Sequence, residues 1–448
     1  MQERTVPFTA VDAFRVDRRT ARVYEHGWQS WSPTTTYPVS VAVSARPAHG
    51  WQQLMRFRAG AAPPESGFQG EGLLAVEPGA GEPIRVYAAP GPHVEVPSIR
   101  ARLEGERLLV AADGPVLTEH VDPDLGTALG VCAERLTSAV GGVTLRPAPR
   151  VWCTWYQYFL EVTEGDVLEN LRAFDERDIP VDVVQVDDGW EAGIGDWLDL
   201  SDRFTSLSDL AARIRDTGRR AGIWVAPFLA GAHSELARIH PDWLLGEAGF
   251  NWDQDLRGLD LTHPEVRDYL ATVFRRLADL GFDYFKLDFL YAGAVPGRRA
   301  EHTSAVAAYR SGLELIREAV GPDSYLLGCG APMLPSIGLV DGMRVSPDTY
   351  DPTDAHDGRN PLRGRPCIEA RAWQHGRLWV NDSDCLIVRP GFARREQWAA
   401  LVERYGGLRS SSDRILDLDD WGLETTRRLL AEPPPPQPFT HLPDELRR

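Results

Sequence analysis

Short apolar runs separated by turn residues dominate the first part of the chain. They lie at residues 21–24, 39–43, 73–76, 84–87, 108–111 and 143–145. Turns that contain Gly or Pro, such as Gly79-Ala80-Gly81, stand between them. This alternation is typical of β-strands, and no convincing helical pattern interrupts it. The sequence therefore predicts an N-terminal β-sandwich over residues 1–148.

From Val151 onward, short apolar runs alternate with longer stretches that have helical periodicity. The strand candidates are residues 151–156, 181–186, 221–226, 284–289, 325–328, 342–346 and 378–382, with an eighth near 407–411. The helical stretches are residues 164–177, 207–218, 264–280, 303–320 and 393–405. An alternating β/α order implies a parallel sheet, and this number of strands favours a (β/α)8 TIM barrel over residues 149–430.

A proline-rich segment, residues 431–448, ends the sequence. It reads AEPPPPQPFTHLPDELRR and includes four consecutive prolines. Such a run favours an extended, stiff conformation, so we expect a tail or linker here.

Composition and charge exclude several classes of partner. The 448 residues are 43% hydrophobic and 25% charged, which is typical of a globular protein, and the net charge is −17. A chain this acidic is repelled by nucleic acid and by anionic membrane surfaces. No apolar run reaches 18 residues, and the segment MQERTVPFTAVDAFRV lacks the apolar core of a secretory signal. The five cysteines are scattered and form no C-x-x-C pair, so we expect a cytoplasmic protein with reduced thiols.

The carboxyl ends of the predicted barrel strands carry the candidate chemistry, because active sites of TIM barrels lie there. In strand order these positions are Trp155 and Tyr156; Asp187, Asp188 and Trp190; Trp224 and Pro227; Lys286 and Asp288; Cys329; Arg344, Ser346 and Asp348; Asn381, Asp382 and Asp384. Carboxylates and tryptophans dominate and histidine is absent. This combination suits carbohydrate, because sugar faces stack on indoles and carboxylates accept hydrogen bonds from hydroxyls.

Lys286 is the only lysine in the chain, whereas 47 residues are arginine. Residues two apart on a strand share a face, so Lys286 lies beside Asp288. An ammonium group favours the ionised form of a neighbouring carboxylate, as a nucleophile requires. A structural ion pair inside the barrel, with the lysine retained by chance, is the alternative.

Other acidic residues leave alternatives open. Asp348 follows the sixth predicted strand and could supply the second carboxyl of a retaining glycosidase, with Asp351 and Asp354 as competitors, or it could simply occupy a turn. The pair Asp187 and Asp188 could bind a polyhydroxylated ligand or lie in a solvated loop. Cys329 could line a ligand site or be a small buried residue.

No metal or organic cofactor is expected. Asp351, Asp354, Asp357 and Asn360 form an acidic loop, but their spacing misses the EF-hand pattern. The histidines lack metal-ligand spacing, and nucleotide-binding glycine motifs and G-x-S-x-G are absent from the sequence.

Several ordered segments resemble glycoside hydrolase family 36, the melibiase-like α-galactosidases of clan D. They are GWQSWS at 27–32, VWCTWYQYFL at 151–160, VVQVDDGW at 183–190, GIWVAPF at 222–228, YFKLDFLYAGAVPG at 284–297, GCGAP at 328–332, VDGMRVSPDT at 340–349 and LWVNDSDCLIVR at 378–389. The resemblance extends to about residue 425. It departs from the family in one respect, because we expect the C-terminal β-domain that usually follows the barrel to be absent or vestigial.

The resemblance implies a role for each matching residue. Asp288 would be the nucleophile and Asp348 the general acid/base. Asp187 and Asp188 would bind galactose hydroxyls, as would Lys286 and Arg344, with Cys329 near the 2-hydroxyl. The pocket walls would be Trp31, from the sandwich domain, with Trp155 and Trp224.

The expected function is hydrolysis of terminal α-linked galactose from oligosaccharides by a retaining exo-α-galactosidase. An α-N-acetylgalactosaminidase or a transgalactosylase would use the same pair of carboxyls. A non-catalytic sugar-binding barrel and a structural protein with an acidic cleft are alternatives of other classes. A homo-oligomer remains open, since the barrel bottom that a C-terminal domain would cover is expected to be exposed or paired with another subunit.

Overall fold

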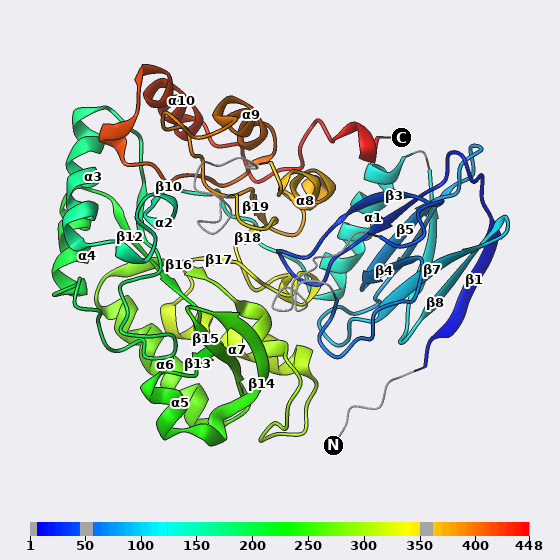
Figure 1. Cartoon of the computed structure of the whole chain (residues 1–448), viewed down its shortest axis with the longest axis horizontal. Coiled ribbons are helices and arrows are strands. Elements are labelled where there is room, and N and C mark those ends of the chain that lie inside the picture. Colours follow the sequence, from blue (N-terminus) through cyan, green and yellow to red (C-terminus); the bar gives the residue numbers. More distant parts are fainter. Residues whose placement is uncertain (1–6, 45–56, 123, 350–361, 448) are drawn as a thin grey trace.

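Two antiparallel sheets form the N-terminal part of the molecule, on the right in Figure 1. The computed structural model describes residues 7–44, 57–122, 124–349 and 362–447. One sheet has five strands in the order β3 (Thr35–Pro38), β2 (Arg22–Glu25), β5 (Leu73–Glu77), β6 (Ile84–Ala88) and β9 (Leu117–Val121). The other has four, in the order β1 (Thr9–Arg15), β8 (Arg107–Ala112), β7 (Ser98–Glu104) and β4 (Phe68–Glu71). Buried side chains of both sheets, including Val23, Val76, Ile99 and Val110, form one hydrophobic core.

A helix follows these sheets, where the sequence analysis expected none. Helix α1 (Leu125–Ala139) begins at Asp124, whose side chain accepts a hydrogen bond from the backbone of Thr127. Its buried residues recur at helical spacing: Leu125, Ala128, Leu129, Cys132, Ala133 and Leu136. The apolar periodicity was therefore present in the sequence. The predicted strands at 39–43 and 143–145 are also wrong, since no strand lies there in the structure.

The second part of the molecule is a nearly closed barrel of eight parallel strands, as the sequence predicted (Figure 1). The strands follow the order β19 (Val380–Asp382), β18 (Gly342–Arg344), β17 (Tyr325–Gly328), β16 (Phe282–Leu287), β12 (Arg220–Val225), β11 (Val183–Val186), β10 (Arg150–Cys153) and β20 (Arg409–Ser411). A parallel bridge between Asp382, at the end of β19, and Leu408, directly before β20, brings the two ends of this sheet together.

Helices surround this barrel. Those at the predicted positions are α3 (Glu164–Glu176), α4 (Leu207–Asp216), α6 (Pro264–Asp279), α7 (Ala305–Val320) and α9 (Arg395–Tyr405), whereas α10 (Asp420–Ala431) was not predicted. Local sequence explains where they begin: Thr163 and Asp166 cap α3 reciprocally, Ser206 caps α4, and Pro264 occupies the first turn of α6. The shorter α2 (Trp155–Tyr158), α5 (Glu235–Ile239) and α8 (Arg365–Ala370) lie in the connections.

A small antiparallel sheet is inserted between β12 and β16. It consists of β13 (Leu229–Gly231), β15 (Gln254–Leu259) and β14 (Leu244–Asn251). Trp252 and Asp253 form the tip of the β14–β15 hairpin, with φ of 49° and 55°. Positive φ at two consecutive residues is the backbone of a tight hairpin turn that glycine or asparagine usually adopts. The sequence analysis did not predict this insertion.

The loop at 28–32 attaches the N-terminal sheets to the barrel. Met333 donates its backbone N–H to the carbonyl of Trp28 over 2.9 Å, and Ser30 donates to that of Ala331 over 3.1 Å. Arg371, fully buried, holds the loop from the barrel side. Its guanidinium donates to the carbonyls of Ser30, Gln29 and Ser32 and to Val345 of the barrel.

The proline-rich tail packs against the barrel rather than extending as a free linker. The ring of Phe439 stacks on His375 with centroids 4.1 Å apart, and Leu446 is 1% exposed. Arg22 of β2 reaches the carbonyl of Glu445 at 3.1 Å. The tail therefore contacts both the barrel, at His375, and the N-terminal part of the molecule, at Arg22. The proposed domain boundaries themselves stay predictions.

None of the helices in the described part of the chain is long and apolar enough to cross a membrane.

Candidate functional site

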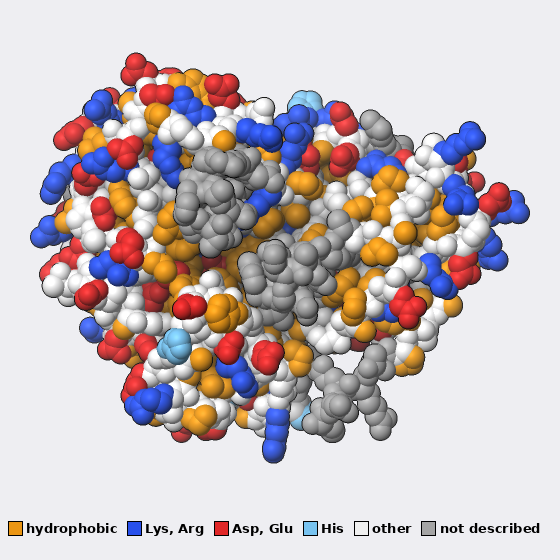
Figure 2. All heavy atoms as spheres, viewed as in Figure 1, with side chains coloured by type: hydrophobic (Ala, Val, Ile, Leu, Met, Phe, Trp, Pro, Cys, Tyr) orange, Lys and Arg blue, Asp and Glu red, His pale blue; other side chains and the backbone are white. Residues whose placement is uncertain are grey.

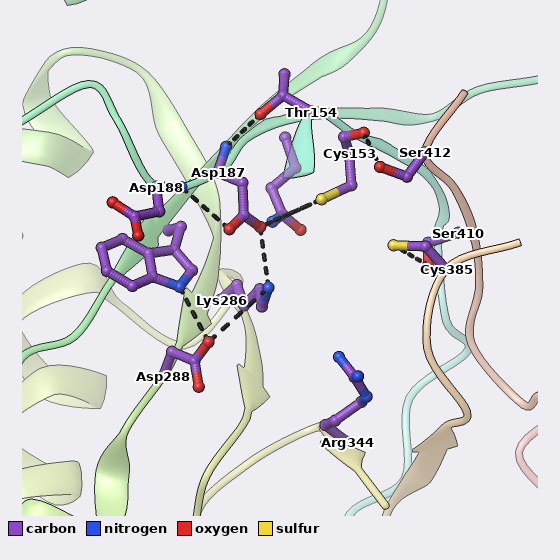
Figure 3. Close-up of polar contacts among 12 residues, drawn as sticks. Cys153, Thr154, Asp187, Asp188, Lys286, Asp288, Arg344, Cys385, Ser410 and Ser412 are labelled. Atoms are coloured by element: carbon purple, nitrogen blue, oxygen red, sulfur yellow. Dashed lines mark hydrogen bonds and ion pairs between the residues drawn. The ribbon is translucent and has the colours of Figure 1, made fainter. Parts of the chain in front are cut away.

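Lys286 lies between two carboxylates at the carboxyl end of the barrel (Figure 3). Its Nζ is 2.9 Å from Oδ2 of Asp187 and 3.9 Å from Oδ2 of Asp288. Burial disfavours the ammonium form, but the two carboxylates outweigh this and hold the pKa of Lys286 well above its usual value. Lys286 is therefore a permanent positive charge in this site. The structure thus brings Lys286 and Asp288, which the sequence predicted to be neighbours, together with Asp187, which follows β11.

Asp288 accepts hydrogen bonds on both of its oxygens. The indole Nε1 of Trp224 donates to Oδ2 over 3.0 Å, and the backbone N–H of Phe289 donates to Oδ1 over 2.8 Å. Phe289 has a φ of 50°, so the chain turns sharply directly after Asp288. Two donors and a nearby ammonium stabilise the ionised carboxylate. The group is 6% exposed, and its carboxylate is oriented by all three neighbours.

Asp187 is held by the floor of the site. Besides Lys286, its Oδ2 accepts from Nε2 of Gln185 over 2.5 Å and from the thiol of Cys153 over 3.2 Å. Oδ1 accepts the backbone N–H of Asp188 over 3.0 Å. Cys153, Gln185 and Lys286 lie on β10, β11 and β16, so three strands contribute to the position of this carboxylate.

Asp188 points in another direction, toward the inserted hairpin. The indole Nε1 of Trp252 donates to its Oδ2 over 2.8 Å. Burial raises the pKa of Asp188, and the neighbouring carboxyl of Glu191 adds to the effect. Hydroxyl donors from a ligand would relieve this repulsion, which is consistent with the predicted role in binding a polyhydroxylated molecule.

Arg344 and Asp348 approach from the other side of the barrel mouth. Arg344, at the end of β18, is directed toward the same space as Lys286 in Figure 3. Its Nη2 lies 3.0 Å from Oδ1 of Asp348 and 2.5 Å from Oδ2 of Asp384. Burial raises the pKa of Asp348 to about 6, against the opposing effect of Arg344. The charges of Lys286 and Asp288 also act on this pKa, Lys286 lowering it and Asp288 raising it.

Aromatic side chains surround these charges. Trp224 contacts Trp252 edge-on at 6.2 Å between centroids, and Trp252 packs against Phe289 at 4.9 Å. Trp31, from the loop at 28–32, meets Phe289 edge-on at 4.9 Å. Figure 2 shows hydrophobic side chains around a depression near the centre of this face. Trp155 lines a cavity in the barrel mouth together with Lys286, Arg344 and Asp384.

Cys329 follows β17 and is 1% exposed. Its backbone N–H donates to the carbonyl of Leu287 over 2.7 Å, which places the residue beside β16. Burial raises the pKa of the thiol, and Asp288 acts in the same direction. Cys329 thus remains a neutral thiol close to the carboxylate. All ten residues singled out from the sequence lie in or around this mouth of the barrel.

The described residues contain no group of three or more His, Cys, Asp or Glu side chains arranged to hold a metal ion. Asp351, Asp354, Asp357 and Asn360, considered above for acid catalysis or a cation, lie outside the described residues.

One residue of this site was missed by the sequence analysis, and another was named there without a role. Trp252 lies at the tip of a hairpin rather than at a strand end, and no local signal marked it. Asp384 stood among the strand-end residues, but nothing in the sequence distinguished it from Asp382. Its contacts, including a 2.5 Å hydrogen bond from Tyr156, show its place beside Arg344.

Comparison with known proteins agrees with this geometry. The sequence model of the Melibiase family matches residues 143–315. The bifunctional α-galactosidase/sucrose kinase AgaSK of Mediterraneibacter gnavus is 30% identical over 160 residues, which are 31% of this chain and 17% of the relative. The matched segments span less than a third of the length of the curated relatives.

Solved structures match over most of the chain. TtGalA, an α-galactosidase from Thermus thermophilus in complex with p-nitrophenyl α-D-galactopyranoside, is 31% identical with a TM-score of 0.76. The match covers 92% of this chain and 86% of that one. The GH36 α-galactosidase AgaA from Geobacillus stearothermophilus shares the fold at 16% identity and a TM-score of 0.62, over 94% of this chain and 61% of that one. With the barrel, the strand-end carboxylates and these similarities together, the chain belongs to the glycoside hydrolase family 36 α-galactosidases.

Proposed function

We propose that this protein is a retaining exo-α-galactosidase that releases terminal α-linked galactose from oligosaccharides. The observation that carries the proposal is the arrangement around Lys286. Its ammonium lies between Asp187 and Asp288, and it lines one cavity with Arg344, whose guanidinium contacts Asp348. A carboxylate oriented for attack and a carboxyl with a raised pKa are the two groups that a retaining glycosidase requires. The α-galactoside bound to TtGalA supports the choice of sugar.

In the first step, a carboxylate oxygen of Asp288 attacks the anomeric carbon. The bond from that carbon to the leaving oxygen breaks, and the leaving oxygen takes the proton of Asp348. In the second step, water attacks the anomeric carbon of the covalent galactosyl-enzyme and gives its proton to Asp348. The bond to Asp288 then breaks, and galactose leaves with its configuration retained.

The other residues have roles in binding. Asp187 and Asp188 accept hydrogen bonds from ring hydroxyls, Lys286 and Arg344 donate to the sugar, and Cys329 borders it. Trp31, Trp155 and Trp224 wall the pocket. Trp252 packs against both Trp224 and Phe289, and we expect these rings to border the bound terminal sugar. No cofactor takes part in this proposal. The cysteines are free and buried, which supports the expectation of a reduced, cytoplasmic setting.

The test is hydrolysis of an aryl α-galactoside compared with the α-glucoside and the α-N-acetylgalactosaminide. We expect the galactoside to be preferred and α-galactose to appear first by NMR. Asp288→Ala should abolish turnover, and azide should rescue it with formation of β-galactosyl azide. Asp283→Ala is the matched control, because Asp283 lies at the other end of β16 in an ion pair with Arg220.

Other outcomes identify the alternatives. Preference for the N-acetylated substrate indicates an α-N-acetylgalactosaminidase, and dominant transfer to sugar acceptors indicates a transgalactosylase. Full turnover by Asp288→Ala, or first formation of the β-anomer, contradicts the mechanism. Sugar-induced thermal stabilisation without turnover identifies a binding protein.

A further inference from the structure

Asp384 is a buried carboxylate with an unusual backbone and many partners. It lies two residues after β19, is 1% exposed, and has a φ of 92°. Residues other than glycine rarely adopt such a φ, and they are retained in it where surrounding contacts stabilise it. Asp384 has these contacts: its Oδ1 accepts the backbone N–H of Cys385 over 2.7 Å, and its own N–H donates to Oδ1 of Asp382 over 2.8 Å.

The other oxygen of Asp384, Oδ2, contacts two residues beside Asp348. They are Thr349, which follows Asp348 in the chain, and Arg344, which pairs with its carboxylate. Oδ2 accepts the backbone N–H of Thr349 over 2.7 Å and its hydroxyl over 2.6 Å, so it holds the residue next to Asp348 in the chain. The same oxygen lies 2.5 Å from Nη2 of Arg344, the atom that contacts Asp348 at 3.0 Å. Tyr156 donates its hydroxyl to this oxygen as well, over 2.5 Å.

We propose that Asp384 is a positioning residue for Asp348, which it orients through Thr349 and partly shields from Arg344 by competing for the same guanidinium nitrogen. The inference rests on the proposed function, because it takes Asp348 as the acid/base. Without Asp384, Arg344 would be free to pair fully with Asp348 and stabilise its ionised form. The acid would then lose its proton at a lower pH.

Charged and titratable groups face Asp348 from several elements of the barrel. They are Lys286 and Asp288 from β16, Cys329 after β17, Arg344 from β18, Asp384 after β19, and Tyr156 from α2. Arg363, which precedes α8, donates its Nε to the backbone carbonyl of Asp348 over 2.5 Å. Among the described residues, Arg344 is the cation that forms an ion pair with the carboxylate of Asp348. The carboxylate of Asp384 contacts the same guanidinium nitrogen, Nη2 of Arg344. The balance between these two carboxylates therefore decides how strongly Arg344 favours the ionised form of Asp348.

The test is the variant Asp384→Asn, which keeps the shape, removes the charge and tolerates a positive φ. General acid catalysis matters for a poor leaving group and hardly for a good one. We therefore expect hydrolysis of an alkyl α-galactoside to fall by about 100-fold at neutral pH, within the range of about 10² to 10⁴ that such catalysis contributes. Hydrolysis of a nitrophenyl α-galactoside should change much less. The basic limb of kcat/KM against pH should move to lower pH by about one unit, as a loss of about 1.4 kcal/mol would produce.

Asp413→Asn is the matched control. Asp413 is also fully buried and paired with an arginine, Arg389, over 2.8 Å, but it makes no contact with Asp348 or Arg344. In Asp413→Asn, the basic limb of kcat/KM against pH should stay where it is in the wild type. If Asp384→Asn does not fold, Asp384→Gly is the second variant, because a φ of 92° suits glycine. The same shift is expected from it.

The outcomes separate this inference from the proposed function. An equal loss on both substrates, with the basic limb unchanged, means that Asp384 has only a structural role and overturns the inference. If Asp348→Ala hydrolyses the alkyl galactoside as well as the wild type does, the assignment of the acid/base fails instead.

Discussion

The indole of Trp252 donates a hydrogen bond of 2.8 Å to the carboxylate of Asp188. The two residues are 64 positions apart and come from different kinds of element. Asp188 ends a barrel strand, whereas Trp252 lies in the turn of an inserted hairpin with positive φ. The hairpin thus reaches back to orient a carboxylate of the barrel mouth, and it closes the site on that side.

Trp252→Phe should weaken substrate binding. The substitution keeps an aromatic ring against Trp224 and Phe289 but removes the donor to Asp188. A hydrogen bond to a charged group contributes about 1.5 to 3 kcal/mol. We expect kcat/KM for an aryl α-galactoside to fall by about tenfold or more, mainly through KM. Trp421→Phe, on the outer helix α10, is the control and should leave both constants unchanged. Unchanged KM in Trp252→Phe would show that the indole does not orient Asp188.

Lys286→Arg should inactivate the protein although it preserves the charge. The ammonium lies 2.9 Å from Asp187 and 3.9 Å from Asp288 in a buried corner, where a wider planar guanidinium does not fit without moving the carboxylates. We expect kcat to fall by about 100-fold or more, as when one preorganised donor is removed from an active site. The measurement is kcat on an aryl α-galactoside, with the melting temperature as a check on folding. A folded variant with wild-type kcat would contradict the role of Lys286.

Much of the barrel and its mouth could be predicted from the sequence. Several barrel strands are short apolar runs with a polar residue at or just after their end, as Asp187 follows β11 and Asp288 follows β16. Because parallel strands end at one edge, residues as distant as Asp187, Asp288 and Arg344 were expected to meet there. Lys286 was recognisable because it is the only lysine. The family resemblance then supplied roles that spacing alone left open.

The rest depends on contacts that no local pattern records. Trp252 reaches Asp188 through the geometry of a hairpin, and Arg371 binds a loop more than 330 positions away. Asp384 differs from Asp382 only in its backbone conformation and in what surrounds it. The missed helix α1 is a different case, because its periodicity was visible but lay among residues that otherwise favour strands. The four prolines favoured an extended chain. The tail nevertheless packs on the barrel, because Phe439, which follows the prolines, stacks on His375.

Arg371→Met should destabilise the protein and disturb the pocket. The buried guanidinium donates to carbonyls of Gln29, Ser30 and Ser32, and the substitution leaves them without this donor. An unsatisfied buried polar group costs about 1 to 3 kcal/mol, so we expect a loss of about 3 kcal/mol or more in the free energy of unfolding.

Because Trp31 lies in the same loop, KM should also rise in Arg371→Met. Arg310→Met is the control: Arg310 also binds backbone carbonyls, those of Pro335 and Ile337, but does not contact this loop. It should lower stability without raising KM. Wild-type stability in Arg371→Met would show that water replaces the guanidinium.

Acidification should lower the free energy of unfolding through His375, which contacts the C-terminal tail. Nδ1 of this buried ring accepts the backbone N–H of Asn381, and Nε2 lies 3.2 Å from the carbonyl of Pro435, so the neutral tautomer satisfies both contacts. Burial lowers the pKa of His375 to about 4 from its ordinary value of 6.5. The unfolded chain therefore binds a proton first, and the stability that the neutral ring provides is present above pH 6.5 and is lost as the pH falls toward 4. At 1.36 kcal/mol per pH unit, the loss in the free energy of unfolding amounts to about 3 kcal/mol.

His375→Gln should flatten the curve of unfolding free energy between these pH values, measured by urea denaturation. The variant His233→Gln, at an exposed position, should leave the curve unchanged. An unaltered slope in His375→Gln would assign the acid sensitivity to other groups.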